Sequence, residues 1–167
     1  MKLKHTLITV ALGLMVAAPA AQAAIQSWNF SGAVDSGSLL GETYSGNFNF
    51  DDAALTGIDA EWLSVANLSM TFNGSAYTQA DVAAGAAVEV GYQDGVFLGL
   101  AYSVDSAANP FTFVAGRYDT SDAYFAYGNG AGNVIYASVP EPKDWMLLLA
   151  GIGLVGVMVE RAKRRRV

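Results

Sequence analysis

Short runs in which apolar and polar residues alternate dominate the sequence between residues 24 and 138. Trp28 and Phe30 are separated by Asn29, and the same alternation recurs over residues 47–50 and 67–72. A period of two residues places alternate side chains on opposite faces of a β-strand. No long stretch between these runs has the spacing of an amphipathic helix. The pattern therefore predicts an all-β domain built from half-buried strands.

Turn-forming pairs separate the apolar runs. Asp94-Gly95 lies between the runs 88–92 and 96–102, and Asp-Gly between apolar runs is a strong hairpin signal. Asn73-Gly74 and Asn129-Gly130 repeat the pattern. We expect about eight or nine short strands joined by such turns, which predicts an antiparallel β-sandwich of jelly-roll type over residues 24–138. Further strands in this count are expected over residues 111–116, 123–127 and 133–138, and at most a turn of helix over 51–61 and 81–87.

Charge is distributed unevenly along the chain, which has a formal net charge of -6. Between residues 24 and 138 the one basic residue is Arg117, and acidic side chains far outnumber it. Such a surface repels a phosphate backbone, so we exclude nucleic acid as a partner. The acidic residues of this segment are Asp35, Glu42, Asp51, Asp52, Asp59, Glu61, Asp81, Glu89, Asp94, Asp105, Asp119 and Asp122.

Catalysis in this domain would have to use carboxylates. The chain has no cysteine, its single histidine is His5, and residues 24–138 contain no lysine. The domain therefore lacks the groups for Ser-His-Asp or Cys-His catalysis, for the usual zinc sites and for a Schiff base. A glycosidase-type pair among Glu42, Glu61 and Glu89 remains conceivable, but no spacing selects two of them. We expect no catalytic residue, no cofactor and no enzymatic activity.

Two acidic clusters and a set of tyrosines are candidates for binding. The clusters at residues 51–61 and 119–122 contain oxygen ligands suited to Ca²⁺, although neither has the spacing of an EF-hand loop. Turn formation and solubility explain these aspartates more simply, so no metal site is predicted. Exposed tyrosines can stack on sugar rings, whereas strand packing accounts for most tyrosines in a β domain. The tyrosines considered are Tyr44, Tyr77, Tyr92, Tyr102, Tyr118, Tyr124, Tyr127 and Tyr136.

The first 23 residues have the three parts of a secretory signal peptide. A basic start at residues 2–5 precedes an apolar run over residues 7–18, and Ala21 and Ala23 form an A-x-A cleavage site. We expect signal peptidase to cut between Ala23 and Ala24. The alternative, a retained membrane anchor, is disfavoured because the apolar run is short for a membrane span.

The C-terminal segment ends in an apolar run followed by a basic cluster. Trp145 opens about fifteen consecutive apolar residues, which is a short span, but an interfacial Trp and snorkelling basic residues extend its reach. We predict a transmembrane helix with its basic end in the cytoplasm, by the positive-inside rule. A buried core helix is the alternative, although such a helix usually keeps a polar face. The basic residues are Arg161, Lys163, Arg164, Arg165 and Arg166.

A short motif precedes this helix. Pro140 and Pro142 fix their own φ and disfavour helix at the residues before them, Val139 and Glu141, so the motif presents an extended strip. The order Val139-Pro140-Glu141-Pro142, Trp145, apolar helix and terminal Arg cluster resembles the PEP-CTERM sorting signal of exopolysaccharide-producing Gram-negative bacteria. The resemblance covers residues 139–167. It implies recognition and cleavage by an exosortase-type enzyme of the inner membrane.

These features predict three segments: a signal peptide at 1–23, an exported β-sandwich at 24–138 and a sorting signal at 139–167. We expect export through the inner membrane, transient anchoring by the C-terminal helix with the domain outside the cytoplasm, and a final place on the cell surface or outside the cell. The expected role is structural or adhesive, in a biofilm or exopolysaccharide matrix. A carbohydrate-binding or Ca²⁺-dependent binding module is the alternative, and a carboxylate hydrolase is a third.

Overall fold

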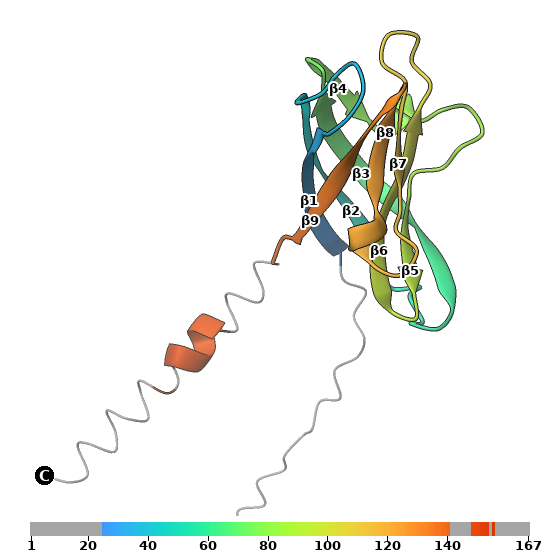
Figure 1. The fold of residues 1–167 in the computed structure, drawn as a ribbon. Coiled ribbons are helices and arrows are strands. Elements are labelled where there is room, and N and C mark those ends of the chain that lie inside the picture. The colour runs from blue at the N-terminus through green and yellow to red at the C-terminus, as the bar shows by residue number, and fades with distance from the viewer. Residues whose placement is uncertain (1–24, 141–147, 154, 156–167) are drawn as a thin grey trace, which may run out of the picture.

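The computed structural model describes residues 25–140, 148–153 and 155. Residues 25–140 form an antiparallel all-β fold (Figure 1). Its elements are β1 (Ile25–Val34), β2 (Thr43–Asp51), β3 (Ala60–Phe72), β4 (Ser75–Thr78), η1 (Gln79–Asp81), β5 (Glu89–Gln93), β6 (Val96–Val104), β7 (Phe111–Val114), η2 (Thr120–Asp122), β8 (Tyr124–Tyr127) and β9 (Gly130–Ser138). The predicted strand runs are confirmed, and η1 and η2 are short 3-10 turns.

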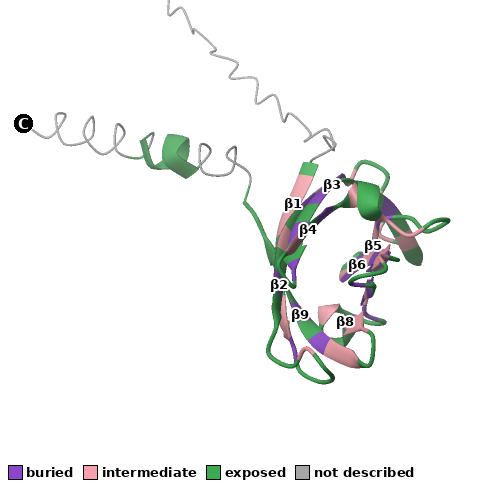
Figure 2. Cartoon of the chain, turned by 90° about the horizontal axis from the view of Figure 1, so that it is seen from above, coloured by how far each residue is buried: buried purple, intermediate pink, exposed green. Residues whose placement is uncertain are grey.

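Eight of the strands close into a barrel. Around it the order is β1, β2, β3, β5, β6, β7, β8 and β9, and β9 pairs back onto β1. Strand β4 pairs with the last residues of β3, 69–72. The same residues pair with β2 along their other edge. Figure 2, seen from above, shows the strands curving round in a ring.

The predicted jelly-roll sandwich is wrong, because strands that follow one another in sequence also pair in space. A jelly roll needs long connections that carry the chain between two sheets, whereas here every strand pairs with the next one in sequence, except that β5 pairs with β3 and not with β4. Both architectures have one buried and one exposed face, so both produce the same alternation in sequence. The pairing of β1 with β9 closes the barrel and joins Phe30 to Tyr136 and Trp28 to Ser138, residues that are far apart in the sequence.

Two of the three predicted turn pairs lie where the sequence placed them. Asn73-Gly74 and Asp94-Gly95 connect paired strands, and all four residues have positive φ, between 47° and 78°. The third turn is shifted by one residue: Gly128 and Asn129 form it, and Gly130 already belongs to β9. A Cβ at Gly130 would lie 2.3 Å from the backbone oxygen of Ser36, so a close approach between chain segments explains this glycine.

The barrel interior is a packed aromatic core. Phe125 is fully buried, and its ring centroid lies 4.2 Å from that of Tyr44, 4.9 Å from that of Phe72 and 5.0 Å from that of Phe113. An eight-stranded barrel has an interior just wide enough for side chains to fill. Further rings in this network belong to Phe30, Phe48, Phe50, Tyr77, Tyr92, Phe97, Tyr102, Phe111 and Tyr136.

The first and last strands begin and end at the same end of the barrel. Because β1 and β9 are antiparallel neighbours, Ile25 and Pro140 both lie at this end, which we call the tail end (Figure 1). The loops 52–59, 94–95 and 115–123 also lie there, by the alternating direction of the strands. The connections 35–42, 73–74, 105–110 and 128–129 lie at the opposite end, the far end.

Most of the predicted targeting residues lie outside the described residues. These are the signal peptide 1–23 with Ala21 and Ala23, together with Ala24, Glu141, Pro142, Trp145, Arg161, Lys163, Arg164, Arg165 and Arg166. Residues 148–153 and 155 are helical. Within the described parts of the chain, no helix has the length and apolar character needed to cross a membrane.

Candidate functional site

The predicted sorting motif starts where the barrel ends. The backbone N–H of Val139 donates to the carbonyl oxygen of Ser27 at 2.8 Å, which is the last bond between β9 and β1. Pro140 has no N–H and is exposed, so it cannot extend the ladder. The barrel and the predicted motif are therefore contiguous, with no linker between them.

The three glutamates considered for catalysis are far apart on the barrel. Glu42 precedes β2 at the far end, whereas Glu61 is the second residue of β3 at the tail end. Glu89 pairs with Ser64 in the β3–β5 ladder. Glu61 and Ser64 are an odd number of residues apart on β3, so the Glu61 and Glu89 side chains point to opposite faces of the sheet. The strand pairing thus brings no two of these carboxylates together.

Glu61 instead holds the loop between β2 and β3. Its Oε1 accepts the backbone N–H of Thr56 at 2.8 Å and the Thr56 hydroxyl at 2.9 Å, while Oε2 accepts the backbone N–H of Gly57 at 2.7 Å. The hydrogen bond from the Thr56 backbone contributes most to lowering the pKa of Glu61, because it stabilises the ionised carboxylate. This carboxylate serves to shape a loop.

Other aspartates also accept hydrogen bonds from nearby turns. Asp94 accepts the backbone N–H of Asp59 at 3.0 Å, and Asp119 accepts that of Ser121 at 2.7 Å. Asp81 closes a capping box with Thr78 at the start of η1. Among the described residues, no group of three or more acidic or histidine side chains is arranged to hold a metal ion. The contacts support the turn-forming interpretation of the acidic clusters.

Tyr44, Tyr92, Tyr102 and Tyr136 are four of the tyrosines in the barrel interior. The Tyr44 hydroxyl donates to the carbonyl of Asn133 and the Tyr102 hydroxyl to that of Thr78, each at 2.6 Å, whereas the Tyr136 hydroxyl accepts the backbone N–H of Leu100 at 3.0 Å. Burial raises the pKa of all four phenols, to about 12 for Tyr92 and Tyr136. These tyrosines are core residues and cannot stack on a sugar.

The buried phenols predict alkaline unfolding. Folding raises the pKa of Tyr92 from 10.0 to about 12, so the folded state keeps a proton that the unfolded chain has lost. This contribution to stability is complete below pH 10.0 and is lost as the pH rises through about 12. We expect cooperative loss of the β-sheet circular dichroism signal in that window, together with the appearance of tyrosinate absorbance. In the Tyr92→Phe variant the pH midpoint of this unfolding transition should be higher, because one group that favours the unfolded state at high pH is gone. Full tyrosine ionisation with an intact β-sheet signal would contradict this.

Trp62 presents a flat aromatic surface on the outer wall of the barrel. Its exposed fraction is 51%, and it pairs with Gly91 in the β3–β5 ladder. A Cβ added to Gly91 would lie 3.0 Å from Cζ3 and 3.1 Å from Cη2 of the indole. The ring therefore lies over Gly91, which it buries. Because Gly91 has no side chain, the indole rests directly on the sheet.

Polar side chains flank this indole. Ser64 pairs with Glu89 and Ala60 pairs with Gln93, two residues to either side of the Trp62–Gly91 pair and hence on the same outer face. The Gln93 amide donates to Asp94 at 2.9 Å, which leaves its carbonyl oxygen available. A carboxylate, an amide and a hydroxyl thus share the outer face with the ring, at the neighbouring positions along the two strands.

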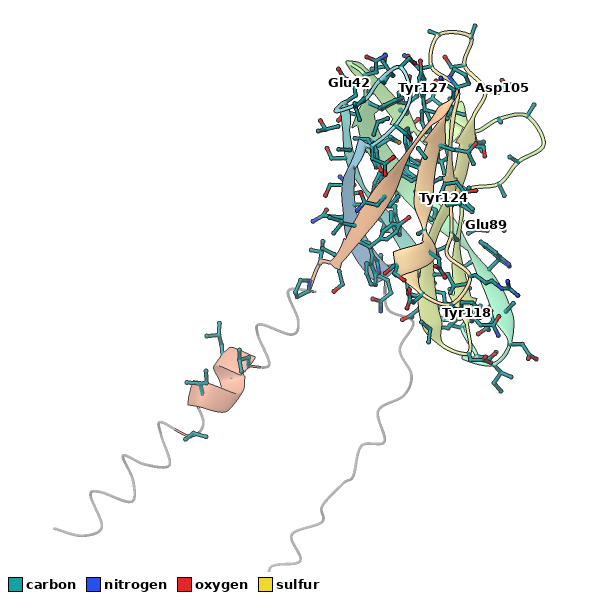
Figure 3. The ribbon with its side chains drawn as sticks, in the orientation of Figure 1. Glu42, Glu89, Asp105, Tyr118, Tyr124 and Tyr127 are labelled. Carbon is teal, nitrogen blue, oxygen red and sulfur yellow. The ribbon has the colours of Figure 1, made fainter. Side chains whose placement is uncertain are left out.

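A second exposed aromatic side chain lies in a loop that packs beside this part of the wall. The backbone N–H of Gly116 donates to the carbonyl of Leu98 at 2.8 Å, and the Leu98 Cβ lies 3.5 Å from the position of a Cβ on Gly91. Two residues further on, Tyr118 is 66% exposed, with the Arg117 guanidinium carbon 5.2 Å from its ring centroid. Figure 3 shows Tyr118 and Glu89 toward the same flank of the barrel.

A shallow depression of about 500 Å³ lies at the far end, beside β6, β7 and β8. Ser103, Thr112 and Tyr127 supply hydroxyl groups to it, and Asp105 is the one carboxylate among its lining residues (Figure 3). A hydrolytic pair needs two carboxylates, so this depression does not provide one.

No protein-family model, curated protein or solved structure matched this chain. The functional interpretation therefore rests on the residues themselves. The sequence interpretation missed Trp62 because it assigned residues 51–61 to a loop and began the next strand near residue 67. The alternation of Leu63 and Val65 with Trp62 and Ser64 was the available signal for an outward-facing tryptophan.

Proposed function

We propose that this protein is an exported, non-enzymatic surface protein. Signal peptidase removes residues 1–23, and the C-terminal segment holds the barrel outside the inner membrane until an exosortase-type enzyme cuts near Pro140-Glu141-Pro142. The barrel then remains on the cell surface or in the extracellular polysaccharide, where it is structural or adhesive. The class is that of a sorted surface protein with a β-barrel cargo domain.

The observation that carries this proposal is the position of the two chain ends on the barrel. Only Ala24 lies between the predicted signal-peptide junction and Ile25, and the predicted motif begins at Val139, which is bonded to Ser27 at the same end. Both targeting segments therefore leave from the tail end. Five residues separate Val139 from Trp145, and five extended residues span at most roughly 18 Å. Before processing, the tail end would stay close to the membrane.

The roles of the carboxylates support a non-enzymatic barrel. Glu61, Asp94 and Asp119 accept hydrogen bonds from their own loops, and the strand pairing keeps Glu42, Glu61 and Glu89 apart. A glycosidase needs two carboxyl groups that face each other across a cleft at about 5–10 Å. A structural role requires no such pair of carboxyl groups. It requires a stable exported fold, and a closed barrel suits this because closing the ladder removes sheet edges that could pair with other chains.

Intact-mass analysis of the protein recovered from cells and from the medium tests the proposal. We expect the membrane fraction to hold a chain that starts at Ala24 and keeps its Arg cluster, and the extracellular fraction to hold a chain that lacks residues after the motif. A chain that keeps Arg161 through Val167 in the extracellular fraction would overturn the processing step. A chain that keeps residues 1–23 would overturn export through signal peptidase.

A further inference from the structure

We propose that the outer wall around Trp62 is a carbohydrate-binding surface that takes the flat face of a β-linked pyranose in an uncharged polysaccharide. The proposal goes beyond sorting and does not depend on it, because Trp62, Gly91 and Glu89 belong to the barrel itself. It names the class of molecule to which an adhesive protein of this kind would bind.

The Trp62 indole packs on the sheet at Gly91. Several glycines of the structure have a positive φ, but Gly91 is not one of them. The backbone conformation therefore does not require glycine at this position. The Trp62 ring is what favours glycine, because a Cβ would lie 3.0 Å from the ring and force it to shift. Glycine at this position lets the six-membered ring of the indole pack against the backbone of the sheet, while about half of the side chain (51%) stays exposed. A fixed aromatic ring loses little entropy when a ligand stacks on it.

The chemistry of the ring defines what stacks on it. The face of an aromatic ring carries the negative part of its quadrupole. A β-linked pyranose with equatorial hydroxyls presents axial C–H groups, which carry partial positive charge, from a flat apolar face. Its hydroxyls then point sideways, toward the positions of Glu89, Gln93 and Ser64 that flank the Trp62–Gly91 pair. Carboxylate and amide oxygens accept hydrogen bonds from such hydroxyls.

The loop after β7 extends the surface. Tyr118 exposes most of its ring, and Arg117 lies against that ring at 5.2 Å. The bond between Gly116 and Leu98 fixes the start of this loop beside the strand that carries Leu98 next to Gly91. A second aromatic ring near the first suits a polymer, which offers successive sugar units, better than a single small sugar.

The charges near Trp62 distinguish a neutral glycan from other occupants. Glu89, Asp94 and Asp119 are acidic, and Arg117 is the one basic side chain among the residues that the structure describes. Phosphate-bearing lipid surfaces and nucleic acids are repelled by such a surface, as are polysaccharides rich in uronic acids. Sugar hydroxyls instead donate hydrogen bonds to carboxylates, and such bonds are charge-assisted and strong. An uncharged glycan is therefore the occupant that fits both the ring and its surroundings.

The test uses the full chain, purified in a detergent without a sugar headgroup, and insoluble cellulose and chitin as probes. We expect retention on at least one of them that persists at high salt, and binding about 10-fold or more weaker for Trp62→Ala, as expected for the loss of one stacking contact. Tyr124→Ala is the matched control, because Tyr124 is an exposed aromatic residue on β8, at 44% exposure. It should bind as the unchanged chain does.

Two further variants keep the proposal falsifiable if Trp62→Ala disturbs the fold. Gly91→Ala should tilt the indole, and Glu89→Gln should keep the shape and remove the charge, so both are expected to weaken binding while the thermal midpoint of Glu89→Gln stays unchanged. Failure of the unchanged chain to bind either polymer would overturn the proposal, as would undiminished binding by Trp62→Ala. Retention on anionic vesicles in place of the polymers would also overturn it. None of these outcomes bears on signal-peptide or motif cleavage.

Discussion

Replacing Phe125 with alanine is expected to lower the free energy of unfolding of the barrel by about 3–5 kcal/mol. The ring is fully buried and lies within 4.2–5.5 Å, centroid to centroid, of Tyr44, Phe72, Phe111 and Phe113. Its removal leaves a cavity that a closed barrel cannot collapse, because the strand ladder fixes the distance between opposite walls. The free energy of unfolding of a single domain is about 5–15 kcal/mol in total, so this loss is a large fraction of the stability of the barrel.

Denaturant unfolding followed by circular dichroism measures this change. The neighbouring residue gives a matched control, because Tyr124 precedes Phe125 on β8 and points to the outer face. Tyr124→Ala is expected to change the free energy of unfolding by no more than about 1 kcal/mol. Equal losses in the two variants would mean that the interior is not the core of this fold.

The second large effect is expected from the double variant Pro140→Ala, Pro142→Ala. Without the two rings, the chain after Val139 is no longer held extended, and it gains backbone N–H groups and access to helical conformations. A peptidase cleft that binds an extended strip then has to order this segment itself. We expect most of the protein to remain full-length in the membrane fraction, with little processed chain outside the cell.

Quantitative immunoblotting of cell and medium fractions measures the result. Pro110→Ala is the control, because Pro110 is an exposed proline in a loop at the far end and lies outside the motif. This control should be processed like the unchanged chain. Normal processing of the double variant would show that Pro140 and Pro142 are a helix-breaking linker and not a recognition motif.

The sequence alone was sufficient to identify the strands and most of the turns. Residues such as Phe48, Phe50, Met70 and Phe72 alternate with polar neighbours, and in the structure all four are buried. Local chemistry explains this success: a two-residue period and an Asn-Gly or Asp-Gly turn act within a few residues of each other. The absence of His, Cys and Lys from residues 24–138 likewise needed no structure, because composition decides which catalytic chemistries are possible there.

The tertiary structure decided how the strands are arranged and what lies on the outside. Closure depends on β1 meeting β9, more than a hundred residues apart in the chain, and a sandwich and a barrel share the same alternation. The Trp62 surface also could not be seen without the fold. Gly91 lies beside Trp62 only through the β3–β5 ladder, and Gly116 lies beside Leu98 only through a loop hydrogen bond. Periodicity records which face of a strand is buried, whereas pairing between distant strands depends on the summed packing of the whole chain, which no local pattern contains.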